Sequence, residues 1–345
     1  MSSLFHSHHP FRIFFVSATI TLLSLGLVGY NMGITSLLLC CALILIEITF
    51  SFDNAIINAR VLASMSKLWQ QLFMTVGMFI AVFGMRLVFP ILLVMLTAGL
   101  GANEVVDLAL HHPEVYSEKL VHAHPYIAAF GGMFLLMLAL AFFFDPGRKV
   151  LWINVIERPM QRVGKWWIYT LISTIVLLVA AFLPVNHHPT ETLLAGTIGI
   201  VLFSVLNALT SSISDTETKN LIKKQTMWSG FTSFLYLEVL DASFSLDGVI
   251  GAFAITQDVI LITIGLGIGA LWVRSLTLFM VRRRTLHAYR YLEHGAHYTI
   301  AVLAFVLLVS LFFEIPEAIA GVAGLIIVGT SIASSVAVAK LEESH

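Results

Sequence analysis

The sequence has few charged residues and few cysteines, and each scarcity excludes a class of protein. Only 11% of the 345 residues are charged and the formal net charge is −1, so charge indicates no nucleic-acid partner. Cys40 and Cys41 are neighbours in an apolar stretch, which excludes a disulfide framework. The chain has no His-Glu-x-x-His motif, nucleophile elbow or phosphate-binding loop, so we expect neither an enzyme nor an organic cofactor.

Apolar residues are what the sequence has in excess. They make up 58% of the chain and give a mean hydropathy of +0.92, which excludes a soluble globular domain. Runs of about 18 apolar residues or more recur, each long enough to cross a bilayer core of roughly 30 Å. Because lipid offers no partner for open backbone groups, we predict an all-α, polytopic membrane bundle.

The apolar runs predict ten transmembrane helices in a single transporter domain, residues 1–345. We place them at about 12–30, 34–58, 69–98, 124–144, 166–184, 192–213, 229–254, 258–281, 296–313 and 316–339. The polar segment 99–121 is predicted to be a loop, and residues 145–165 to be charged and amphipathic. Lys and Arg are concentrated in the loops of one side, and the opposite loops contain only Lys119, so both termini are expected to be cytoplasmic.

One polar motif interrupts the apolar pattern twice. The stretch Glu47–Ile56 and the stretch Asp241–Ile250 share the pattern acid-x-(Thr/Ser)-Phe-Ser-apolar-Asp-(Asn/Gly)-apolar-Ile. Ionisable groups at membrane depth are costly, and by default they mark a site on a substrate path. Two such motifs in corresponding parts of the chain indicate a transporter built from repeats.

Further matches extend the repeat beyond this motif. Gly77 and Arg86 are separated by the same nine positions as Gly265 and Arg274, and His122 matches His294. The equivalent helices are five apart, an odd number, and therefore cross the membrane in opposite directions. This predicts an inverted repeat of five plus five helices, with repeat 1 at about 12–184 and repeat 2 at about 192–339. In such folds the substrate site lies near the midplane, where the repeats meet.

The two acids of each motif can point toward one site only if the helix that carries them is interrupted. On a regular helix Asp53 lies about 120° from Glu47, and Asp247 lies as far from Asp241. An interruption near Phe52-Asp53, with Asp53-Asn54 restarting the helix, would aim both acids at one point. We expect the same at Asp247-Gly248.

The motif oxygens predict a site for a hard cation. Carboxylate, amide and hydroxyl oxygens suit divalent ions such as Mn²⁺, Mg²⁺ or Ca²⁺, and the motifs contain no cysteine or histidine for a softer metal. Repulsion among up to four carboxylates would also make proton–metal exchange possible. The predicted ligands are Glu47, Asp53, Asn54, Asp241 and Asp247, with Ser51 and Ser245 in support.

For each of the other polar residues the sequence leaves two possible roles open. Arg86 and Arg274 pair with an acid, for example Asp53 or Asp247, either as fixed neutralising partners or as counter-ions that let go when metal arrives. Glu238 is a third ligand or proton carrier, or else an interfacial residue bonded to a neighbouring helix. His122 and His294 are gate residues, or histidines that are only solvated.

The first motif resembles the acid-x-x-x-Ser-x-Asp-Asn signature of the TerC family of integral membrane proteins. The second copy, from Leu237 to Gly248, resembles the related DUF475 group, which is often placed with TerC and LysE-type exporters. The likeness covers about residues 34 to 339. It implies metal-ion export with Mn²⁺ as the leading substrate, the five predicted ligands as ion-binding residues, and the inner membrane of a bacterium as the location. The chain departs from the TerC pattern at Gly248 and Asp241, where Asn and Glu are expected.

Two other functions remain open. An exporter of a small organic solute fits the LysE relationship, although an organic zwitterion would not need four carboxylates. An intramembrane protein that uses a metal or heme for redox chemistry is the other, although the best candidate histidines lie at helix ends.

Overall fold

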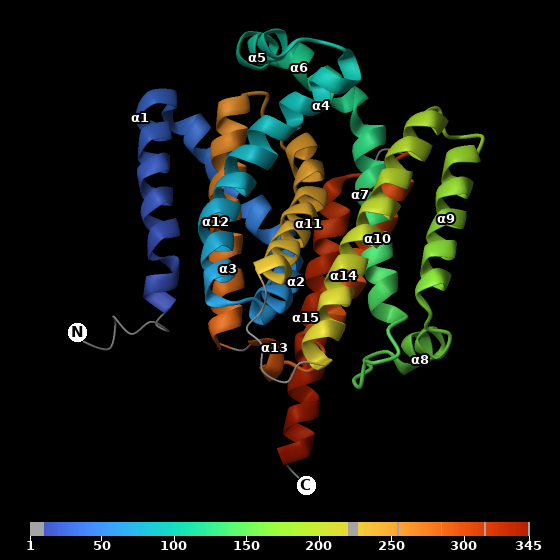
Figure 1. The fold of residues 1–345 in the computed structure, drawn as a ribbon. Helices are drawn as coiled ribbons and strands as arrows, with labels where there is room; N and C mark the ends of the chain where they lie inside the picture. Colours follow the sequence, from blue (N-terminus) through green and yellow to red (C-terminus); the bar gives the residue numbers. More distant parts are fainter. Residues whose placement is uncertain (1–9, 220–226, 254, 284, 314, 344–345) are drawn as a thin grey trace. The chain divides into compact units, whose positions relative to one another are not determined.

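A computed structural model of the chain describes residues 10–219, 227–253, 255–283, 285–313 and 315–343. Side chains are described there except at positions 10–12, 210–219, 227, 228, 246, 247, 286, 287, 317, 318 and 343. The described chain is helical and contains no strand, which confirms the all-α class (Figure 1).

The helices follow one another along the chain with short connections. They are α1 (Pro10–Phe50), α2 (Phe52–Ser64), α3 (Lys67–Leu72), the π-helical segments η2 (Phe73–Gly77) and η3 (Ile80–Val88), α4 (Phe89–Ala98), α5 (Ala102–His111), α6 (Pro113–His122), α7 (His124–Phe143), α8 (Asn154–Arg162), α9 (Trp166–Phe182), α10 (Pro189–Lys219), α11 (Met227–Phe253), α12 (Val259–Arg283), α13 (Thr285–Ala288), α14 (Leu292–Val309) and α15 (Glu317–Glu343).

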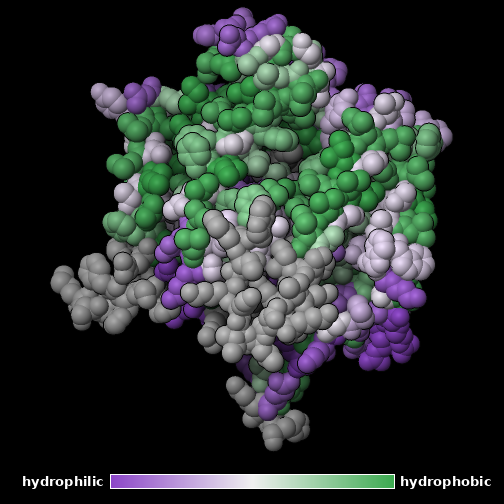
Figure 2. All heavy atoms as spheres, in the orientation of Figure 1, coloured by the Kyte–Doolittle hydropathy of each residue, from purple (hydrophilic) through white to green (hydrophobic). Residues whose placement is uncertain are grey.

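Seven of the described helical segments are long and apolar enough to cross a membrane, or eight if the bent pair α8 and α9 counts as one span. Hydrophobic side chains cover the sides of the helices in Figure 2, and hydrophilic ones gather over α5, α6 and α8. The chain is therefore a membrane protein by the length and composition of its helices. The count of ten crossings stays a prediction.

Two helical segments meet inside α1 at Gly33, so α1 is not one continuous helix. Gly33, inside α1, has φ +84° and ψ 179°, a backbone conformation that glycine adopts without a steric penalty. The kink coincides with the predicted end of the first helix at Asn31-Met32-Gly33.

The described residues fall into two compact units, each built from two stretches of chain. Unit 1 contains Met1–His124 and Phe234–Arg284, and unit 2 contains Pro125–Ser233 and Thr285–His345. Each unit therefore takes residues from both predicted repeats. All residues of the cavity described below belong to unit 1.

The predicted loop at 99–121 is wrong, because this segment forms α5 and α6. Both helices are amphipathic and bury Val105, Ala109, Tyr116 and Leu120 in the core of unit 1. Burial also raises the pKa of the Tyr116 phenol far above its usual range, so this side chain stays neutral. Polar composition misled the prediction, since the apolar residues recur at helical spacing.

Small residues allow close helix packing in both units. In unit 1, a Cβ added to Gly265 would lie 2.6 Å from Leu43 Cβ on α1. In unit 2, one added to Gly199 of α10 would lie 2.6 Å from the Phe130 carbonyl oxygen of α7. Helices in lipid associate largely through such packing.

Candidate functional site

The first motif lies at an interruption between two helices. Ser51, with φ −97° and ψ 16°, leaves the helical conformation and separates α1 from α2. The turn stays hydrogen-bonded, because the Ser51 amide donates to the Glu47 carbonyl at 3.0 Å. The predicted interruption is thus confirmed, one residue before Phe52. It leaves Glu47 in the last turn of α1 and Asn54 in the first turn of α2.

The second motif has no such interruption. α11 is helical from Met227 to Phe253, so the break expected at Asp247-Gly248 is wrong. A glycine can lie inside a continuous helix, and Gly248 of α11 faces Glu47. A Cβ at Gly248 would lie 3.6 Å from Glu47 Oε2, which places the second motif beside the acid of the first.

Helix α12 brings the two motifs together through another glycine. A Cβ at Gly269 would lie 2.5 Å from both Cβ and Cγ of Glu47, so only glycine leaves room for the stem of this side chain. α12 packs against α1, α2 and η3. α12 therefore packs directly against the stem of the Glu47 side chain.

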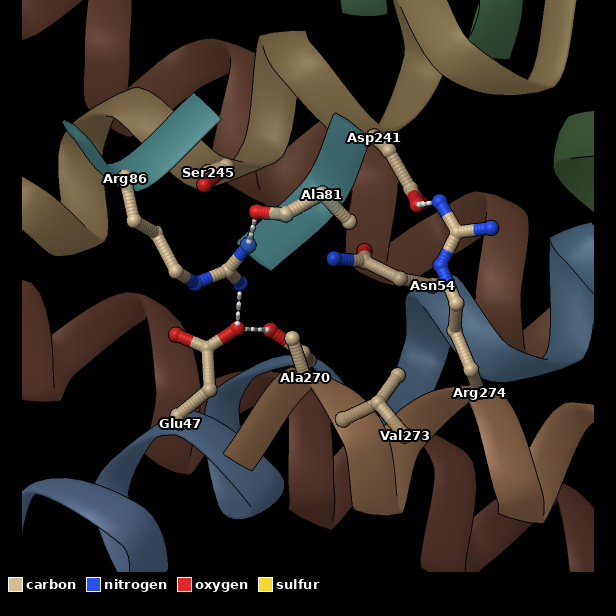
Figure 3. Close-up of a pocket in the computed structure, with 10 residues that line it drawn as sticks. Glu47, Asn54, Ala81, Arg86, Asp241, Ser245, Ala270, Val273 and Arg274 are labelled. Carbon is tan, nitrogen blue, oxygen red and sulfur yellow. Dashed lines mark hydrogen bonds and ion pairs between the residues drawn. The ribbon is translucent and has the colours of Figure 1, made fainter. Parts of the chain in front are cut away.

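The motifs enclose a small cavity (Figure 3). Its volume is about 20 Å³, enough for one water molecule or one small ion. The lining combines residues from five helical segments: Glu47, Ser51, Asn54, Ala81, Arg86, Asp241, Ser245, Ala270, Val273 and Arg274. Seven of these ten were predicted from sequence as site or supporting residues.

Arg86 and Glu47 form a buried ion pair at one side of the cavity. Arg86 Nη2 donates to Glu47 Oε1, and Nη1 donates to the Ala81 carbonyl at 2.6 Å. The Ser51 hydroxyl donates to the same Glu47 oxygen at 3.1 Å. The two charged side chains are 5% and 7% exposed, so the pair is shielded from water.

Arg274 holds two acids at the other side. Its Nη2 donates to Asp241 Oδ2 at 2.6 Å and to Glu238 Oε1 at 3.3 Å. Both arginines therefore pair with an acid, as predicted; among the described side chains the partner of Arg86 is Glu47 and those of Arg274 are Asp241 and Glu238, and neither pairs with Asp53. The predicted repeat matches Glu47 with Asp241 and Arg86 with Arg274, so equivalent arginines hold equivalent acids.

Two oxygen atoms in the lining have no hydrogen-bond partner within the described part of the chain. They are Asn54 Oδ1 and Ser245 Oγ, on side chains that are buried. Figure 3 shows the Asn54 amide between the Glu47–Arg86 and Asp241–Arg274 pairs. Buried polar atoms normally have a partner, so these oxygens indicate a ligand or water in the cavity.

The two other predicted ligands are Asp53 and Asp247. Asp53 is buried but does not line the cavity. The side chain of Asp247 lies outside the described residues. In the part of the chain that is described, no three His, Cys, Asp or Glu side chains lie close enough to hold a metal. The described carboxylates that line the cavity, Glu47 and Asp241, each form an ion pair with an arginine.

The two predicted gate histidines lie away from the cavity. His122 ends α6 in unit 1 and is exposed. His294 is buried in unit 2, with Nε2 3.0 Å from the Val150 carbonyl oxygen and 3.4 Å from Glu157 Oε2. Neither lines the cavity.

Sequence reasoning missed Asn58, which donates from Nδ2 to Asp241 Oδ1 at 2.7 Å. Its signal was available, because Asn58 is one helical turn after Asn54 and is another amide in an apolar helix. It also missed Glu157, which is fully buried and accepts hydrogen bonds from Arg148 at 3.2 Å and from the Tyr298 hydroxyl at 3.3 Å. Glu157 gave no signal because its neighbours in sequence are charged.

The comparisons with known proteins identify a family without an assigned activity. The sequence model of a family described as a protein of unknown function (DUF475) matches residues 52–342. No curated protein matched the chain. No solved structure matched it either.

Proposed function

The chain belongs to the DUF475 family, and we propose that it is a secondary transporter that exports a divalent metal cation, with Mn²⁺ as the leading substrate. One observation carries the proposal. The two motif copies line one buried cavity, and that cavity contains oxygen atoms that lack a hydrogen-bond partner within the described chain.

The donor set around the cavity suits a hard cation. Glu47 and Asp241 supply carboxylate oxygens, Asn54 an amide oxygen, and Ser51 and Ser245 hydroxyl oxygens. Oxygen ligands of this kind suit Mg²⁺, Ca²⁺ and Mn²⁺, and the lining contains no sulfur or imidazole. A volume of about 20 Å³ also matches a single ion better than an organic molecule.

The arginines explain how such a site can be stable without a cation. Two carboxylates left unpaired at membrane depth would be costly, and each forms an ion pair with a guanidinium group here. An entering divalent cation would replace the arginine as the positive partner of the carboxylate in one of these pairs. Arginine release would thereby couple cation binding to a change in helix contacts.

The wider architecture belongs to the same proposal. We infer ten membrane crossings in an inverted repeat of five plus five helices, both termini in the cytoplasm, and a location in the inner membrane of a bacterium. The matched ion pairs Arg86–Glu47 and Arg274–Asp241 support the repeat. A relationship to TerC and LysE-type exporters fits this arrangement.

A small organic solute with both charges is the second candidate. The observation in its favour is that two guanidinium groups line the cavity together with two carboxylates, so both ends of a zwitterion would find a partner. The small cavity would have to expand before such a solute could enter.

The test is cation export by the full-length protein in cells that lack their own copy. Cells with the wild-type chain should accumulate less Mn²⁺ than cells with Glu47→Gln or Asp241→Asn at equal protein levels. Glu104→Gln changes an exposed carboxylate on α5 and serves as the matched control. The proposal fails if both cavity variants keep wild-type export of Mn²⁺ and other divalent cations. Uptake assays with amino acids in place of metal test the second candidate.

A further inference from the structure

Arg86 and Arg274 occupy equivalent places in the predicted repeat, but the structure holds them in different ways. Both are buried and both line the cavity. They differ in the number and origin of their partners, and this difference bears on which arginine can leave its acid.

Arg274 connects three helical segments. Besides Asp241 and Glu238 on α11, it reaches η2, where Nη1 donates to the Phe73 carbonyl at 2.8 Å. Its guanidinium carbon also lies 4.0 Å from the centre of the Phe73 ring, a favourable cation–π distance. A Cβ at Gly77, one turn further on, would collide with Glu238 and lie 2.6 Å from Arg274 Nη1. Arg274 is therefore held by contacts with both α11 and η2.

Arg86 has a much simpler environment. One of its hydrogen bonds goes to Ala81, in its own helical segment. Within the described part of the chain, its hydrogen bond to another segment goes to Glu47 alone. Loss of that ion pair would release Arg86 from α1 and leave its hydrogen bond within η3 in place.

Asp241 and Glu47 also differ in how firmly hydrogen bonds hold their carboxylates. Both oxygens of Asp241 accept a hydrogen bond, one from Asn58 and one from Arg274. The repeat places Ala252 where Asn58 stands in the first copy, so Glu47 has no equivalent amide. Glu47 Oε2 accepts no hydrogen bond from the described residues and faces Gly248.

We propose that the two halves of the site have different tasks. Arg86 is the counter-ion that leaves Glu47 when the cation enters, whereas Arg274 is a fixed structural cation that, with Asn58, holds Asp241 in position. This assignment rests on the proposed cation transport and adds which ion pair opens.

The experiment compares the same substitution at the two arginines. Purified full-length wild type, Arg86→Gln and Arg274→Gln are titrated with Mn²⁺ by calorimetry, and their thermal unfolding is recorded. Arg86→Gln should be less stable than wild type, because Glu47 loses its buried partner, but it should still fold and bind Mn²⁺ about tenfold more tightly or better, because a competing charge in contact with the acid has been removed. Arg86→Lys, which keeps that charge, should restore an affinity close to the wild-type value. Arg274→Gln should lose much of its folded protein, and what remains should not bind more tightly.

The outcomes separate this inference from the proposed function. If wild type binds Mn²⁺ and Arg86→Gln fails to fold, binds less tightly, or behaves like Arg274→Gln, the division of tasks is wrong and the transport proposal stands. If wild type binds and transports neither Mn²⁺ nor another divalent cation, both are overturned.

Discussion

Asn58 on α2 donates a hydrogen bond of 2.7 Å to Asp241 on α11, across 183 positions of sequence. The bond joins the helix that follows the first motif to the acid that opens the second. The bond therefore joins the two predicted repeats, whereas the pairs Arg86–Glu47 and Arg274–Asp241 each lie within one of them.

Loss of this link should destabilise the protein. We expect Asn58→Ala to lower the free energy of unfolding by about 1–3 kcal/mol, because a largely buried carboxylate loses a donor. Thermal and denaturant unfolding of the purified full-length protein measure the change. Asn31→Ala removes an exposed amide that bonds only within α1, at 2.8 Å to Leu27, and should stay within about 0.5 kcal/mol. Equal effects of the two variants would contradict the prediction.

Asn54 should matter for binding more than for folding. Its Oδ1 has no hydrogen-bond partner in the described chain, so Asn54→Ala should cost about 1 kcal/mol of stability or less. The Mn²⁺ affinity of the same variant should fall about tenfold, since a ligand oxygen is removed. Asn58→Ala, one turn away, is the comparison, because it should lower stability more than Asn54→Ala and Mn²⁺ affinity less. An unchanged Mn²⁺ affinity in Asn54→Ala would remove this amide from the ligand set.

Gly269 should tolerate no side chain. The added Cβ of Gly269→Ala would overlap the stem of Glu47 at 2.5 Å, and we expect a loss of about 1–3 kcal/mol together with weaker Mn²⁺ binding. Gly26→Ala is the matched control, because no atom lies within 4 Å of its added Cβ. That variant should be neutral or more stable by about 0.4–1 kcal/mol. Unfolding midpoints of the two purified variants decide the matter.

Glu157 should be a structural acid of unit 2. Glu157→Gln would leave Arg148, 8% exposed, without its carboxylate partner, so we expect a loss of roughly 3–5 kcal/mol. Glu342→Gln breaks the exposed pair with Arg290, whose side chains are 49% and 66% exposed. That change should cost less than about 1 kcal/mol. Similar unfolding midpoints for both variants would show that burial does not matter here.

Sequence reasoning located the acids but not their partners. Glu47, Asn54, Asp241 and Ser245 were identified because polar residues in apolar helices are conspicuous. The equal Gly-to-Arg spacings predicted that Arg86 and Arg274 correspond, and in the structure each contacts the acid that opens the motif of its own predicted repeat. Which acid each arginine contacts depends on helix rotation and distance, and neither is encoded in spacing along the chain.

The boundaries of regular structure were only partly predictable. The kink at Gly33 and the break at Ser51 lie where turn-forming residues meet apolar runs. The break expected at Asp247-Gly248 is absent, because a glycine inside a continuous helix looks the same in sequence as one that ends a helix. The helices α5 and α6 were mistaken for a loop for a related reason, since their polar faces outweigh their apolar ones in composition.

The division of the chain has a consequence for biosynthesis. Unit 1 needs both Met1–His124 and Phe234–Arg284, and the whole of Pro125–Ser233 is translated between them. A ribosome that has reached Ser233 has therefore delivered Glu47 and Arg86 to the membrane, but neither Asp241 nor Arg274. During that interval the nascent chain contains one of the two arginine–acid pairs and only part of the cavity lining, so the cavity can close only after the second stretch has been made.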